Sequence, residues 1–183
     1  MGKTDKTTEQ HFDTLISDAM KIGIEKMSIY GTSWTSYRPG SLMTRMLNKG
    51  KRIVTIQETK DNQVGEKISD GFKEIMNYAA LLGIMLEHKI ELYKELNKEE
   101  VTSFRDIIFK KAKEIMLKKD HDYNGVWRTM SQSEIIDEIN VKIQRMKSVL
   151  EIKKEVSSDN IYDVINYCAF ALILIEEKVH IDM

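Results

Sequence analysis

The chain has 183 residues, of which 42% are hydrophobic and 31% are charged, and its formal net charge is only −1. This balance gives no support to a bulk nucleic-acid-binding or membrane-surface role. One proline and nine glycines favour long helices over a turn-rich β fold.

The single cysteine, Cys168, cannot form an intramolecular disulfide, as expected in a reducing compartment. It lies in an apolar run and is expected to be a small buried hydrophobic residue. The first ten residues are polar and lack the apolar core of a signal peptide. The longest apolar runs are shorter than the roughly 20 residues that cross a bilayer. A cytoplasmic protein without membrane contact is expected.

Helical spacing of apolar residues predicts three helices in the first half, at about 8–29, 41–57 and 64–87. Thr7 or Thr8 is placed to cap the first helix, and Gly31 to end it in the left-handed conformation. Gly50 is expected to interrupt or strain the second helix.

Three further helices are predicted in the second half, at about 102–119, 131–152 and 157–179. Thr102 or Ser103 is expected to cap the first of them. Ser131 or Ser133 opens the next, and Ser131 with Glu134 has the spacing of a capping box. Residues 121–127 are expected to form a loop.

The second half repeats the first by position. We therefore predict an all-α helical bundle of two tandem three-helix repeats, 8–88 and 101–179, related by pseudo-two-fold symmetry and packed as one domain. The pairs that carry the repeat are Tyr30 and Tyr123, Trp34 and Trp127, Lys49 and Lys142, Arg52 and Arg145, Asp70 and Asp159, Glu74 and Asp163, and Asn77 and Asn166.

Carboxylates form one stripe on the third helix of each repeat, because they recur at helical spacing. Hard cations such as Mg²⁺ prefer oxygen ligands and usually retain waters, so two or three carboxylates suffice to hold one. The predicted ligands are Glu66, Asp70 and Glu74 in the first half, and Glu155, Asp159 and Asp163 in the second.

Cations form a matching stripe on the second helix of each repeat, where arginine suits bidentate contact with phosphate. The residues are Arg45, Lys49 and Arg52 in the first half, and Lys142 and Arg145 in the second. Carboxylates for a metal beside cations for phosphate are what hydrolysis of a nucleoside polyphosphate requires. The alternative, that the two stripes neutralise each other as interhelical ion pairs, has about equal weight.

Polar and aromatic positions complete the predicted site. Asn77 and Asn166 suit hydrogen bonds to a base or sugar, or equally to backbone groups inside the bundle. The aromatic residues at the ends of the first helices can stack on a base, but core plugs are the favoured interpretation. These aromatic residues are Tyr30, Trp34, Tyr123 and Trp127.

Three runs in each half resemble the nucleotide modification associated domain 1 family. The family patterns are K-x-x-x-Y-G-x-x-W, R-x-x-x-K-x-x-R and E-x-x-x-D-x-x-x-[DE]-x-x-N-Y. The first copy reads KMSIYGTSW, RMLNKGKR and EKISDGFKEIMNY, and the second reads KDHDYNGVW, EINVKIQR and EVSSDNIYDVINY.

More distantly, the DVINY helix is similar to the last metal-binding helix of the all-α nucleoside triphosphate pyrophosphohydrolases, the MazG and dimeric dUTPase group. This resemblance implies Mg²⁺ held by helical carboxylates and release of pyrophosphate. The E-E-x-x-E motif of that group is missing from both copies. Where the family tends to have Asp, this chain has Asn48 and Val141. Glu138 is expected to supply a substitute ligand, in the second half only.

The sequence therefore predicts a nucleotide, most simply a nucleoside triphosphate, bound and hydrolysed with Mg²⁺ in the second half. Glu138, Glu155, Asp159 and Asp163 are the expected metal ligands, with Asp159 and Asp163 catalytic. Lys142 and Arg145 are expected to hold the phosphates, and the first half to carry a second or degenerate site. The rival is a non-catalytic nucleotide-binding or helical interaction module, which would form a homodimer through its apolar helices.

Overall fold

The computed structural model describes residues 6–179, which form helices joined by loops. No strand occurs in this range, so the predicted all-α class is confirmed. The elements are α1 (Thr8–Tyr30), η1 (Ser33–Ser36), α2 (Pro39–Thr59), α3 (Ile68–Glu87), α4 (Lys98–Asp122), η2 (Val126–Thr129), α5 (Gln132–Glu151) and α6 (Asp159–Glu177), where η marks a 3₁₀-helix.

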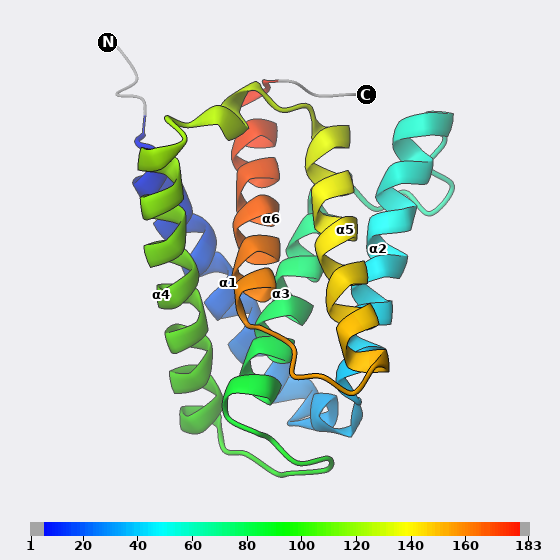
Figure 1. Cartoon of the computed structure of the whole chain (residues 1–183), viewed down its shortest axis with the longest axis vertical. Coiled ribbons are helices and arrows are strands. Elements are labelled where there is room, and N and C mark those ends of the chain that lie inside the picture. The colour runs from blue at the N-terminus through cyan, green and yellow to red at the C-terminus, as the bar shows by residue number, and fades with distance from the viewer. Residues whose placement is uncertain (1–5, 180–183) are drawn as a thin grey trace.

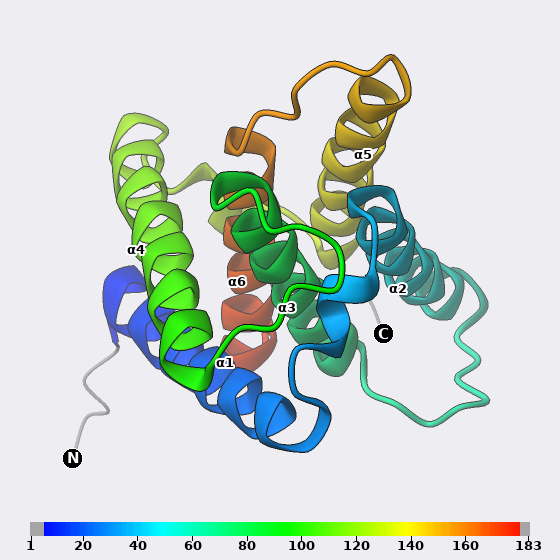
Figure 2. The same ribbon diagram turned by 90° about the horizontal axis from the view of Figure 1, so that it is seen from below.

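The six α-helices pack in three layers of two, each layer holding one helix from each half (Figures 1 and 2). Helices α3 and α6 form the middle layer. Helices α1 and α4 lie against one side of it, and α2 and α5 against the other (Figure 2). Each helix thus contacts its counterpart in the other repeat, as the predicted pseudo-two-fold arrangement requires.

The middle layer is central because α3 and α6 are apolar on most sides. Along α3, residues from Ala79 to Met85 are buried without interruption, and along α6 the same is true from Cys168 to Leu174. A helix that is hydrophobic all round must be covered by other helices. Cys168 is fully buried, as expected, and burial raises the pKa of its thiol.

Three predicted helix ends are confirmed by their caps. Thr7 and Ser131 each form a capping box at the start of α1 and α5. At the end of α1, Gly31 has a φ of 57°. Asn124, its counterpart in the repeat, has a φ of 49°. Glycine and asparagine are the residues that most readily take a positive φ. Gly31 combines it with a ψ of −139°, so its conformation is not the left-handed helical one that the sequence predicted.

Two local predictions, the cap of α4 and the interruption of α2, are wrong. Asn97 caps α4 in a capping box with Glu100, so neither Thr102 nor Ser103 does so. Helix α2 continues through Gly50 without a break. There the missing side chain makes room for Asn140 of α5, whose Oδ1 would lie 2.1 Å from a Cβ.

The structure also differs from the sequence prediction at two loops. Helix α3 begins at Ile68, later than predicted, because Asn62 and Gly65 form a turn before it. The expected 121–127 loop is largely structured, since His121 and Asp122 end α4 and η2 follows at Val126. In the described range, no helix has the length and apolar content needed to cross a membrane.

The cap of α4 gives a direct test of the helix start. Asn97→Ala is expected to lower the free energy of unfolding by about 1 kcal/mol, because the Glu100 amide loses its acceptor. Thr102→Ala serves as the matched control and should change it by less than about 0.5 kcal/mol. Urea unfolding measures both, and a larger loss for Thr102→Ala would contradict the observed cap.

Candidate functional site

Asp163 lies between two lysines from neighbouring helices. Its Oδ2 is 2.9 Å from Nζ of Lys142 on α5, and its Oδ1 accepts a hydrogen bond from Lys119 on α4. The side chains of Asp163 and Lys142 are only 12% and 13% exposed. A carboxylate this buried is costly without cations. The predicted alternative of interhelical ion pairs is therefore present here.

A cavity of about 370 Å³ opens beside this carboxylate, within the size range of small-molecule sites. Helices α4, α5, α6 and η2 all contribute to its lining. Five of the residues predicted from the second half converge on it, namely Tyr123, Trp127, Lys142, Asp163 and Asn166. The remaining lining residues are Met116, Lys119, Asp120, Val126, Met130, Tyr167 and Phe170.

Tyr167 shows how the charges are arranged around the cavity. The pKa of its hydroxyl is raised, first by burial and then by the negative charges of Glu138 and Asp163, with a smaller contribution from Tyr123. Lys142 Nζ lies 5.7 Å from the centre of the Tyr167 ring. The negative charges of Glu138 on α5 and Asp163 on α6 therefore both act on the Tyr167 hydroxyl.

The two predicted asparagines are in different situations. Asn166 is 4% exposed, and its Nδ2 donates to the Ala112 carbonyl at 3.1 Å. Its Oδ1 has no partner among the described residues. A buried acceptor left without a donor is costly. Asn77, in contrast, accepts a hydrogen bond from Arg105 at 2.5 Å.

Trp127 is a packing residue. It is 3% exposed, stacks on Phe170 with 4.3 Å between ring centres, and donates from Nε1 to Asp120 at 2.7 Å. Trp34 is also buried, so the core-plug interpretation holds for both tryptophans. It fails for Tyr30 and Tyr123, which are 65% and 66% exposed. Tyr30 is the last residue of α1, and Tyr123 is the residue that caps the end of α4.

The first-half stripes also pair with each other. Lys49 Nζ lies 2.6 Å from Glu74, and Arg52 lies 3.4 Å from Glu66. Arg52 further donates to the Glu66 carbonyl at 2.7 Å and thereby fixes the loop before α3. Glu66 therefore precedes the helix instead of extending its stripe. With Asp70 and Glu74 it lines a separate cavity of about 270 Å³ between α1 and α3.

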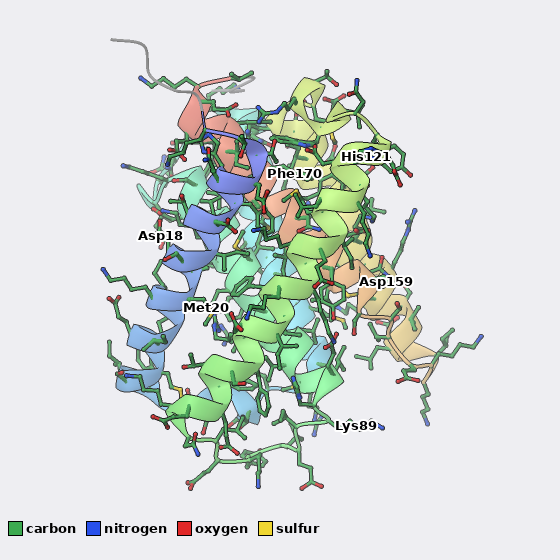
Figure 3. All side chains as sticks on the ribbon, turned by 90° about the vertical axis from the view of Figure 1, so that its left-hand side faces the viewer. Asp18, Met20, Lys89, His121, Asp159 and Phe170 are labelled. Carbon is green, nitrogen blue, oxygen red and sulfur yellow. The ribbon has the colours of Figure 1, made fainter. Side chains whose placement is uncertain are left out.

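Several predicted residues lie outside the second-half cavity. Glu155 precedes α6 and is exposed, and Asp159 is exposed at the first turn of α6 (Figure 3). Arg145 is exposed, and the equally exposed Arg45 lies over the Tyr37 ring at 4.4 Å. Within residues 6–179, no three His, Cys, Asp or Glu side chains are grouped closely enough to hold a metal ion by themselves.

A family model matches this chain over residues 26–86 and 119–175, one segment in each half, under the description nucleotide modification associated domain 1. The chain belongs to this family. Each matched segment begins at a lysine, Lys26 or Lys119, and runs through the last helix of its repeat. No curated protein and no solved structure gives a significant match.

The sequence analysis missed three titratable residues of the cavity: Lys119, Asp120 and Tyr167. Lys119 and Lys26 open the family pattern in the two halves, and Tyr167 follows Asn166 as Tyr78 follows Asn77. The repeat itself was therefore a signal for two of them. Asp120 has Met27 at the same repeat position, so nothing in the pattern distinguished it.

The two aromatic roles can be separated by stability. Trp127→Ala is expected to lower the free energy of unfolding by about 3–5 kcal/mol, since it leaves a void against Phe170. Tyr123→Ala should change it by less than about 0.5 kcal/mol, because the ring is mostly exposed. Equal losses in urea unfolding would show that Tyr123 is a packing residue and remove it from the site.

Proposed function

We propose that the second-half cavity binds a nucleoside triphosphate and that the protein hydrolyses it with Mg²⁺, releasing pyrophosphate as the MazG group does. The observation that carries the proposal is Asp163, a largely buried carboxylate on a cavity wall between two lysines. Carboxylate, cations and aromatic rings are the groups that a metal-bound nucleotide needs, and here they meet in one cavity.

The donor set fits Mg²⁺ in the way this ion usually binds nucleotides. Mg²⁺ keeps several waters and is commonly held by one or two carboxylates plus substrate phosphates. A group of three protein ligands is therefore not required. Asp163 and Glu138 would hold the ion. When bound, Mg²⁺ supplies charge stabilisation to the phosphoryl oxygens.

The residues of the cavity have separate roles in this proposal. Lys119 and Lys142 exchange their contact with Asp163 for contacts with the phosphates, which frees the carboxylate. The unpaired Oδ1 of Asn166 accepts a hydrogen bond from the nucleoside. The exposed ring of Tyr123 stacks on the base.

The family gives this proposal its substrate class, since its description ties these domains to nucleotide modification. The resemblance of the DVINY helix to the last metal-binding helix of the MazG and dimeric dUTPase group is the reason for proposing this reaction type. A non-catalytic nucleotide-binding or helical interaction module is the second candidate. It is favoured by Asn48 and Val141, which stand where the family tends to have Asp.

The test is pyrophosphate release from a panel of ribo- and deoxyribonucleoside triphosphates with and without Mg²⁺. Asp163→Asn should lower kcat/KM at least about 10²-fold, because the charge that opposes both lysines and the metal is lost. Asp137→Asn, which removes an exposed acid from α5, is the matched control and should keep full activity.

A second variant guards against misfolding of Asp163→Asn. Glu138→Gln leaves both lysine contacts of Asp163 intact and should raise the Mg²⁺ concentration needed for half-maximal activity. Wild-type protein that Mg²⁺ and a nucleotide stabilise, but that releases no pyrophosphate, would establish the non-catalytic alternative. Turnover that survives both variants would remove the site assignment.

A further inference from the structure

A second cavity, of about 340 Å³, lies at the matching position of the first half. Its lining repeats that of the second-half cavity at equivalent residues, namely Lys26, Tyr30, Trp34, Asn77 and Tyr78 for Lys119, Tyr123, Trp127, Asn166 and Tyr167. The charge differs, however. The second-half cavity includes Asp120 and Asp163, whereas no carboxylate from residues 6–179 lines the first-half cavity.

Arg105 is the unusual residue of this cavity. Its side chain is 2% exposed and donates a hydrogen bond to Asn77. The guanidinium also lies 5.9 Å from the centre of the Phe109 ring. Its Nε has no partner, and no carboxylate within residues 6–179 forms an ion pair with it. Burial lowers the pKa of Arg105 to about 10, so the guanidinium is still charged at neutral pH.

A buried charge without a counter-charge is strongly unfavourable, and proteins normally pair it. The repeat indicates that packing does not require a cation here. The equivalent position in the first repeat is Phe12, which is fully buried in the core. Gly23 of α1 also makes room for the guanidinium, because a Cβ there would lie 2.6 Å from Arg105 Cζ. Helices α1 and α4 lie side by side on this face (Figure 3).

We infer that this cavity is an anion site whose ligand supplies the missing counter-charge to Arg105. A phosphoryl group suits it, because arginine offers several donors in a planar fork and Lys26 lines the same cavity. Tyr30, Tyr37 and Tyr78 also line this cavity and suit a flat ring. The ligand class is therefore a small phosphorylated molecule with a planar body, such as a nucleoside monophosphate.

Calorimetric titration without Mg²⁺ tests this, with inorganic phosphate, nucleoside monophosphates and the uncharged nucleosides as probes at constant ionic strength. Wild-type protein should bind a monophosphate, bind phosphate more weakly, and bind the nucleoside least. Arg105→Met should weaken monophosphate binding at least about tenfold. Lys110→Met removes an exposed cation from the same helix and should leave binding unchanged.

Gly23→Ala is a second variant that keeps the charge but displaces the guanidinium, and it should also weaken binding. It decides the matter if Arg105→Met does not fold. The inference is overturned if wild-type protein binds none of the probes, or if the folded variants bind them as tightly as wild type does. Because neither Mg²⁺ nor a triphosphate is present, these results are independent of hydrolysis at Asp163.

Discussion

Helices α3 and α6 carry apolar residues around most of their circumference, so neither can face water, and each covers the other at the centre of the bundle. A buried leucine or isoleucine side chain contributes about 1.5–3 kcal/mol, and these helices bury long runs of them. The four outer helices cover the remaining apolar faces of this central pair, α1 and α4 on one side and α2 and α5 on the other. Lysines of the outer helices meet carboxylates near the starts of α3 and α6, before the apolar runs begin. Lys49 contacts Glu74, and Lys119 and Lys142 contact Asp163.

The candidate site lies where the polar first turns of α6 give way to its apolar run. Asp163 stands one turn into α6 and is largely buried. Its negative charge is stable there because cations from the outer layers contact it. Lys119 comes from one outer layer and Lys142 from the other. Glu74 with Lys49 repeats part of this arrangement in the first half. A phosphate ligand can replace the carboxylate as the partner of the lysines, and a metal can replace the lysines as the partner of the carboxylate.

The sequence predicted the repeat, the fold class and much of the second-half cavity, because these depend on helical spacing. Asp163, Asn166 and Lys142 recur at fixed intervals, and a regular helix places them on predictable faces. Cap choice at Asn97 was missed because the apolar pattern of α4 begins only at Val101. The buried state of Arg105 could not be predicted either, since it depends on how α1 and α4 meet at Gly23.

The most direct test of the account is a crystal structure of the protein with Mg²⁺ and a non-hydrolysable nucleoside triphosphate analogue. The account predicts phosphates between Lys119 and Lys142, Mg²⁺ coordinated by Asp163, and the base beside Tyr123. An analogue bound elsewhere, with both lysines still paired to Asp163, would contradict it. In that case the charge stripes serve only to hold the helices together.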